Sequence, residues 1–167
     1  MQMGGVMGRI YTVCDWIWKI ALANILWIFL TLTGCIVFGV MPATVALFTV
    51  VRKWIMKESD ISISQTFFQT FKKEFLPANI LGLIMGAIGF FLFFDFKLVM
   101  AIGGTFQYIL SVPLFIIISL YVITLLYLFP VYVHLDLKLL QYFKNALYIG
   151  TLNIHITISI LAVLLLI

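Results

Sequence analysis

The side chains that could take part in chemistry are few and are scattered along a mostly apolar chain. The sequence has 167 residues, of which 65% are hydrophobic and 10% are charged, and it contains 2 histidines. His155 is an ionisable residue inside an apolar stretch, with Asn153 close to it, and Asn24 lies in an earlier apolar stretch. Ionisable residues inside a membrane span are candidates for proton transfer or ligand binding. A simpler interpretation is that His155 is neutral and hydrogen-bonded to a facing helix, and Asn24 invites the same one.

No pattern typical of a catalytic or metal site occurs in the sequence. HExxH, GxSxG, CxxC and a phosphate-binding glycine loop ending in Lys-Ser/Thr are all absent. His134 and Asp136 are close in sequence, but two ligands are too few for a metal site. Cys14 and Cys35 are interpreted as small apolar fillers. We therefore predict that the protein is not an enzyme and that it binds no metal or cofactor.

The composition indicates a helical membrane protein. Soluble domains are roughly 45–50% apolar and about 25% charged, whereas this chain has a mean hydropathy of +1.23. The net charge of +4 comes from basic residues at the edges of apolar runs, which favours membrane anchoring over nucleic-acid binding. The expected fold is all-α, a single membrane domain over residues 1–167 with about five transmembrane helices and one interfacial helix. The spans are expected at residues 20–40, 42–57, 78–94, 105–133 and 148–167.

Residues 42–57 are open to two interpretations. Gly39 to Pro42 is read as a turn, with Pro42 at the first position of a helix. That helix is either a short second span or a re-entrant helix that returns to the same side. The short span leaves every basic residue except Lys97 on the inner side, whereas the re-entrant helix also puts Arg9 and Lys19 outside. The positive-inside rule favours the short span and a cytoplasmic N-terminus.

The charged segment that follows predicts an amphipathic helix over residues 62–76. Ser62 and Gln65 resemble a capping box, and Pro77 is expected to end the helix. Apolar residues recur every four positions, from Ile63 to Phe75, and form a stripe. We expect this stripe to lie on the inner membrane surface, with docking to a partner protein as the alternative. The candidate contact residues are Arg52, Lys53, Trp54, Phe67, Phe71, Lys72, Lys73 and Phe75.

The third expected span carries a strip of small residues. The strip consists of Ala78, Gly82, Gly86 and Gly89. Small residues at this spacing let another helix approach closely. We expect packing within the chain, with homodimerisation as the weaker alternative. Residues 95–104 are expected to form an outer loop, and the last span stops without a polar anchor, so a sixth span is expected beyond Ile167.

Several stretches resemble one protein family. They are MGRIYTVCDWIWKIALANILW, GVMPATVALFTVVRKWI, SQTFFQTFKKEFLPANILG and HLDLKLLQYFKNALYIGTLN. Together they are similar to the YesL family of small bacterial membrane proteins, a domain of unknown function, so the resemblance supplies no catalytic residue. It implies a multi-pass protein of the Gram-positive cytoplasmic membrane, in a family whose members run longer than this chain. It also implies genes that are often found beside carbohydrate ABC importers.

One main functional hypothesis and two alternatives follow. The main hypothesis is an accessory, non-catalytic protein that sits in the lipid bilayer and associates with an ABC importer for oligosaccharides. The first alternative is an autonomous small transporter or channel that uses the hydroxyl-bearing residues 105–133, and the second is a structural membrane scaffold. No carboxylate lies deep in an expected span, which disfavours an ion-coupled transporter. The oligomeric state stays open.

Overall fold

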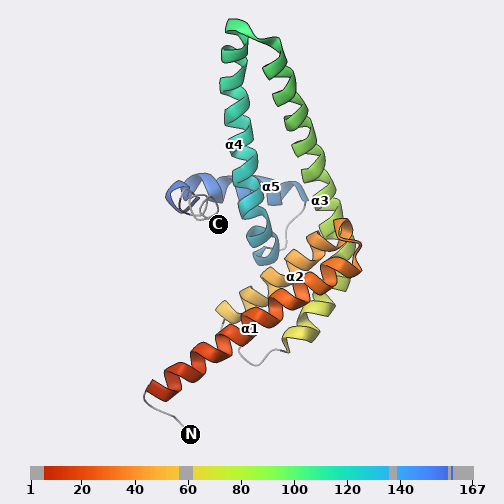
Figure 1. The fold of residues 1–167 in the computed structure, drawn as a ribbon, viewed down its shortest axis with the longest axis vertical. Coiled ribbons are helices and arrows are strands. Elements are labelled where there is room, and N and C mark those ends of the chain that lie inside the picture. The colour runs from red at the N-terminus through yellow and green to blue at the C-terminus, as the bar shows by residue number, and fades with distance from the viewer. Residues whose placement is uncertain (1–5, 57–61, 136–138, 158, 160–167) are drawn as a thin grey trace. The chain divides into compact units, whose positions relative to one another are not determined.

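The computed structural model describes residues 6–56, 62–135, 139–157 and 159 of the chain. Nearly all of these residues are helical, and no strand occurs among them (Figure 1). The helices are α1 (Val6–Thr33), α2 (Val37–Ile55), α3 (Ile63–Ile102), α4 (Gly104–His134) and α5 (Leu139–Leu152). The predicted all-α class is confirmed. The chain divides into two compact units, Met1–Asn79 and Ile80–Ile167, and α3 contributes to both.

Within the described part of the chain, four helices are long and apolar enough to cross a membrane. They comprise Ile10–Thr33 of α1, then α2, α3 and α4. The chain is therefore a polytopic helical membrane protein, as predicted. The fifth expected span, residues 148–167, begins inside α5, and a turn at Asn153 separates α5 from the helical residues 154–157. Residues 160–167 of that expected span lie outside the described residues.

The first turn lies earlier in the chain than predicted. Helix α1 ends at Thr33 and α2 begins at Val37, so Pro42 is inside α2 and does not start it. The turn uses two non-glycine residues with positive φ, Cys35 at 57° and Ile36 at 62°. Gly39 serves close packing and not turning, because a Cβ atom there would lie 2.3 Å from the carbonyl oxygen of Thr31. The predicted boundary between residues 40 and 42 is therefore wrong.

Pro77 does not end a helix either. The predicted helix over residues 62–76, the predicted span 78–94 and most of the predicted outer loop 95–104 belong to one helix of 40 residues. Proline is tolerated inside membrane helices because side chains and neighbouring helices can satisfy the carbonyl groups that it leaves free. The loop is reduced to Gly103. Gly103 and Gly104, the first residue of α4, have φ angles of 68° and 67°, which glycine readily adopts.

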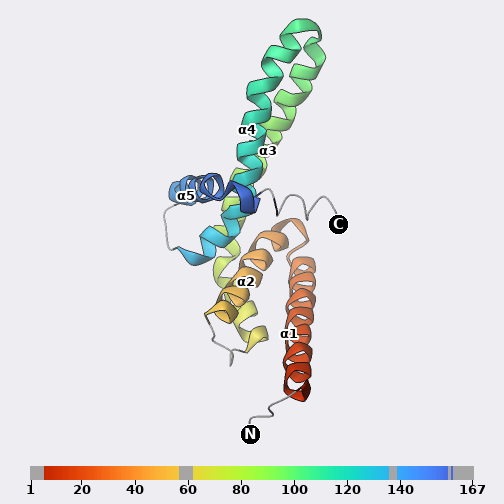
Figure 2. The ribbon, with the colours of Figure 1, turned by 90° about the vertical axis from the view of Figure 1, so that its left-hand side faces the viewer.

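The first unit is held together by a core to which α1, α2 and the first half of α3 all contribute. Figure 2 shows α2 beside both α1 and the start of α3. The core residues are Leu30, Ala43, Ala46, Val50, Ile63, Phe67 and Phe71. Phe67 is fully buried, with 0% of its surface exposed, and Phe71 is 9% exposed. The expectation that Phe67 and Phe71 contact lipid or a partner is therefore wrong, because packing against α2 removes both from the surface.

The second unit is built on the hairpin formed by the second half of α3 and α4. Figure 1 shows α5 lying across α4, with the hairpin continuing beyond it. The core of this unit consists of Leu81, Met85, Leu128, Val131, Tyr142 and Ala146. Beyond the core, Leu114 is a buried residue of α4, whereas its neighbours Phe115 and Ile116 are exposed. Beyond the core, the described part of the hairpin therefore carries exposed apolar side chains.

Candidate functional site

A side-chain amide joins α3 to the first turn of α2. The Nδ2 atom of Asn79 donates a hydrogen bond to the carbonyl oxygen of Phe38 at 2.9 Å and to that of Phe75 at 2.7 Å. Phe38 lies four residues before Pro42, and proline has no N–H group to bond this carbonyl. Asn79 thus satisfies the carbonyl group that Pro42 leaves free. Asn79 was not among the residues predicted from the sequence, although an asparagine just after a proline in an apolar stretch was an available signal.

Two further contacts join α1 to α2. The Nε1 atom of Trp27 donates a hydrogen bond to the hydroxyl oxygen of Thr44 at 3.2 Å. The rings of Trp16 and Trp54 meet edge to face, with centroids 5.8 Å apart. The two helices are antiparallel, so these contacts and the Gly39 contact secure them over their whole shared length.

A tyrosine hydroxyl links α4 to α3 in the second unit. Tyr121 donates a hydrogen bond from its hydroxyl to the carbonyl oxygen of Met85 at 3.0 Å. Gly89 makes this bond possible, because a Cβ atom at that position would lie 2.6 Å from the Tyr121 hydroxyl oxygen. The glycine therefore leaves room for the tyrosine to reach the backbone of α3.

A second tyrosine hydroxyl joins α4 to the end of the described chain. The hydroxyl oxygens of Tyr127 and Thr157 are 3.0 Å apart. Thr157 is 2% exposed, and its hydroxyl also lies 3.1 Å from the carbonyl oxygen of Gly150. A Cβ atom on Gly150 would lie 2.3 Å from the Ile123 side chain, so α5 rests directly on α4 at this point. The hydroxyl groups of Tyr127 and Thr157 thus link α4 to the residues that follow α5.

The predicted strip of small residues does not face a single neighbour. Ala78 is buried in the first unit, and Gly89 contacts Tyr121 in the second. Gly82 is partly buried, and a Cβ atom on Gly86 would meet no atom within 4 Å. Gly89 is the member of the strip at which the structure shows a close contact with another helix.

Two of the three intramembrane polar candidates, Asn24 and Asn153, make local hydrogen bonds. Asn24 donates a hydrogen bond to the carbonyl oxygen of Ile20 at 2.9 Å, and Asn153 donates one to that of Ile149 at 3.0 Å. Both bonds stay within the local helical turn. His155 is exposed, and no hydrogen bond to its ring occurs among the residues that the structure describes. Functional roles for these three side chains stay predictions.

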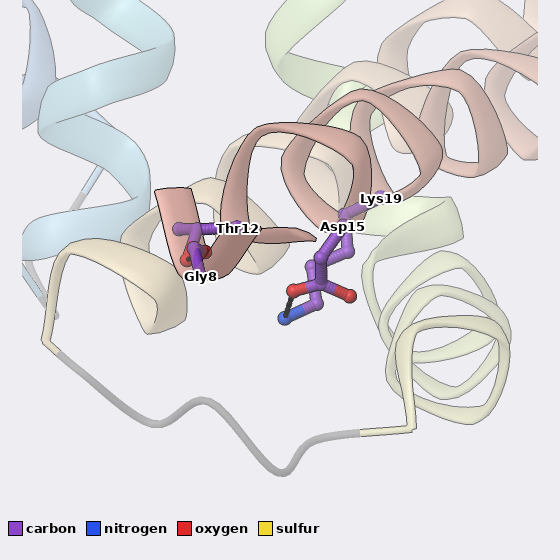
Figure 3. A network of polar contacts seen from close by, with 4 residues as sticks. All are labelled: Gly8, Thr12, Asp15 and Lys19. Atoms are coloured by element: carbon purple, nitrogen blue, oxygen red, sulfur yellow. Dashed lines mark hydrogen bonds and ion pairs between the residues drawn. The ribbon is translucent and has the colours of Figure 1, made fainter. Parts of the chain in front are cut away.

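Basic and aromatic residues gather where α1 begins and α2 ends. Arg52 and Lys53 lie in the last turn of α2, directly before Trp54. The Nε1 atom of Trp54 is buried and has no hydrogen-bond partner within the described chain. On α1, Lys19 forms an ion pair with Asp15, with Nζ 2.7 Å from Oδ2 (Figure 3). This pairing agrees with the one-turn spacing of the two residues.

A second group of basic residues lies on the exposed side of α3, opposite the buried stripe. The Nζ atom of Lys72 is 4.6 Å from the centre of the Phe68 ring. The side chain of Lys73 is 84% exposed, and its Nζ atom is 3.9 Å from a carboxylate oxygen of Glu74. Phe75 is 36% exposed and packs edge to face on Phe71. This side of α3 combines cationic and apolar groups.

Among the described residues, no group of three or more His, Cys, Asp and Glu side chains could hold a metal ion. Cys14 and Cys35 are free and exposed. The described polar groups form helix-to-helix contacts and surface patches.

Comparison with known proteins identifies the family. The family described as "Protein of unknown function, DUF624" matches residues 20–96. The uncharacterized protein YteU of Bacillus subtilis (strain 168) is 38% identical over 162 residues, which cover 97% of this chain and 72% of that protein. The chain belongs to this family. DUF624 relatives from the same organism include the uncharacterized proteins YesL, 40% identical over 82% of this chain and 64% of its own length, and YesV, 36% identical over 89% and 71%. No solved structure matches the chain.

Membership in the DUF624 family confirms the resemblance seen in the sequence. The matched segment, residues 20–96, contains the Asn79 bond to Phe38 and the whole of α2. The names of the relatives state no activity, so function has to be argued from the structure of the chain.

Proposed function

We propose that this DUF624 protein is a non-catalytic membrane protein that acts by associating with other membrane proteins. The observation that carries the proposal is the uncovered apolar surface of the hairpin of α3 and α4. Phe91, Phe106 and Tyr108 on this hairpin are each about 70% exposed, at 68%, 71% and 73%. Two helices alone leave no space between them for a substrate, so the outer surface is the part of the hairpin that can make contacts.

The partner that we propose is an ABC importer for oligosaccharides in the bacterial cytoplasmic membrane. The resemblance to the YesL family supports this choice, because genes of that family are often found beside such importers. Basic residues on the inner side of the spans support a cytoplasmic N-terminus. The protein would then be an accessory component of the importer.

An autonomous transporter or channel is less well supported. Its polar lining would have to come from the hydroxyl groups of α4. Ser111, Ser119 and Thr124 instead donate hydrogen bonds to backbone carbonyl groups of their own helix, at 2.9, 2.8 and 2.8 Å. The hydroxyl of Tyr121 is bonded to α3. A polar solute loses hydrogen bonds when it leaves water, and hydroxyl groups that are already bonded in this way are poorly able to replace them.

Affinity purification tests the proposal. A tagged protein is purified from native membranes in a mild detergent, and the recovered proteins are quantified by mass spectrometry. We expect permease subunits of a carbohydrate importer to be enriched, and we expect Phe91→Ala combined with Phe106→Ala to reduce this enrichment. The matched control is Phe29→Ala on α1, which removes a phenylalanine of similar exposure, 61%, outside the hairpin.

Recovery of importer subunits at the level of an untagged strain would overturn the proposal. Uptake of oligosaccharides by vesicles that contain the purified protein alone would instead support the autonomous transporter. A loss of enrichment with Phe29→Ala equal to that with the hairpin variant would show that the hairpin is not the contact surface.

A further inference from the structure

Helix α2 and the first half of α3 run side by side in opposite directions. At one end, Asn79 is bonded to Phe38 in the first turn of α2. Toward the other end, Val50 and Phe67 lie in one buried cluster. Asn79 is bonded to Phe38, and the two helices run antiparallel from that bond. Lys72 therefore lies level with the middle of α2. Lys73, the next residue, lies at nearly the same level.

This placement conflicts with a membrane-spanning α2. If α2 crossed the bilayer, the two lysines would lie about 12 Å from its nearer end, inside the hydrocarbon layer. The Lys73 side chain is 84% exposed, and Lys72 covers an exposed ring, that of Phe68. A lysine near the centre of a span opposes membrane insertion. Two such residues on one exposed face make the crossing unfavourable.

The length of α3 supports the same conclusion. Crossing the hydrocarbon layer takes about 20 helical residues, which is half of the 40 residues of α3. The first half carries Lys72 and Lys73, whereas residues 78–94 contain no charged residue. The second half of α3 is therefore the half that crosses.

The distribution of positive charge does not oppose this arrangement. If α1, α2 and the first half of α3 all stay at one surface, the second half of α3 crosses outward and α4 crosses back. Lys97 is then the basic residue on the outer side, and all the others lie inside. A short span at residues 42–57 gives the same distribution, so the positive-inside rule does not distinguish the two and the position of the lysines decides.

We infer that α1, α2 and the first half of α3 lie along the inner membrane interface and that α2 does not cross the membrane. The face of α3 that carries Lys72 and Lys73 then lies against the headgroups of anionic phospholipids. Phe68 and Leu76 on the same side, 48% and 73% exposed, supply the apolar contacts that accompany basic residues in the headgroup zone. The exposed residues Ile28 and Phe29 of α1 provide a surface for the hydrocarbon layer.

Cys35, in the turn between α1 and α2, allows a direct test of which side of the membrane this turn lies on. Cys14→Ser leaves Cys35, which is exposed, as the sole cysteine of the chain. In a chain without either cysteine, Lys73→Cys and Lys97→Cys provide references for the two sides. A membrane-impermeant maleimide is applied to right-side-out and inverted vesicles. We expect Cys35 to react in the vesicles in which Lys73→Cys reacts, and Lys97→Cys to react in the others.

Labelling of Cys35 from the side of Lys97→Cys, or from neither side, would overturn the inference, because α2 would then cross or enter the membrane core. Protection of Lys73→Cys in native membranes but not in vesicles of the purified protein would overturn the lipid assignment and favour a partner protein. None of these results depends on whether an importer is recovered, so this inference and the proposed function fail separately.

A lipid titration tests the headgroup contact. Purified protein in a neutral detergent is titrated with phosphatidylglycerol or phosphatidylcholine, and binding is followed by the shift in thermal unfolding. We expect tighter binding of phosphatidylglycerol, weakened about thirtyfold by Lys72→Gln with Lys73→Gln, since each basic group near an anionic surface contributes about 1 kcal/mol. Lys97→Gln with Lys144→Gln removes the same charge elsewhere and is the matched control. The assignment of this face to anionic headgroups would be refuted if the two double variants bound phosphatidylglycerol equally tightly. It would also be refuted if the natural protein bound both lipids equally tightly.

Discussion

Replacing Asn79 by alanine should destabilise the first unit through one identifiable carbonyl group. The side chain donates two hydrogen bonds, but the carbonyl of Phe75 also lies within reach of the backbone N–H of residue 79 in a regular helix. The carbonyl of Phe38 has no such substitute, because Pro42 occupies the position from which the N–H would come. A net hydrogen bond contributes about 1 kcal/mol, and an unpaired carbonyl adds to its loss. We expect Asn79→Ala to lower the free energy of unfolding by about 1 to 2 kcal/mol.

Pro42→Ala isolates this interaction in a double-mutant cycle. The alanine supplies an N–H to the carbonyl of Phe38, so in this background Asn79→Ala should cost about 1 kcal/mol less than in the natural sequence. Unfolding can be followed in mixed micelles by tryptophan fluorescence, because all 4 tryptophans lie within residues 1–79 and report on this unit. Asn24→Ala is the matched control, since Asn24 is bonded only within its own helix in the described structure. A cost of Asn79→Ala that is the same in both backgrounds, or equal to that of Asn24→Ala, would refute the reasoning.

Two matched pairs of substitutions test the packing of each unit. Phe67→Ala should destabilise the first unit by about 3 to 5 kcal/mol, whereas Phe68→Ala on the exposed side should cost less than about 1 kcal/mol; similar costs in tryptophan-monitored unfolding would contradict the buried stripe. Gly89→Ala should displace the hydroxyl of Tyr121 and lower stability, while Gly86→Ala, which meets no neighbour, should raise it by up to about 1 kcal/mol through helix propensity. Thermal unfolding followed by circular dichroism measures the second pair, and a stabilising Gly89→Ala would show that the tyrosine contact is not formed.

The all-α membrane class and the apolar face of a helix could be predicted from the sequence because they depend on composition and local spacing. The spacing of Phe67 and Phe71 correctly predicted one apolar face of a helix. The prediction that this face contacts the membrane surface was wrong, since an apolar stripe packs equally well against a neighbouring helix. The presence of α2 at the right distance to bury Phe67 is a tertiary property that the local pattern does not contain.

The helix boundary at Pro42 was mispredicted because the local rule for proline does not include distant hydrogen-bond donors. Proline ends a helix when the carbonyl that it leaves free has no other donor. At Pro42 the donor comes from Asn79, far away in the sequence, so local rules indicated a break where the structure has none. The true turn uses positive φ at Ile36, a β-branched residue that carries no turn signal in a sequence.

The close packing of α1 against α2 also affects how the protein is made. Near the turn, the backbones of α1 and α2 touch, since a methyl group on Gly34 would lie 2.3 Å from the Cα atom of Gly39. The contacts that close the pair lie within residues 16–54. Synthesis proceeds from the N-terminus, so this pair can assemble before α4 has left the ribosome. We expect Gly39→Ala to be seen first as rapid degradation of the newly made chain, before any activity of the mature protein can be assayed.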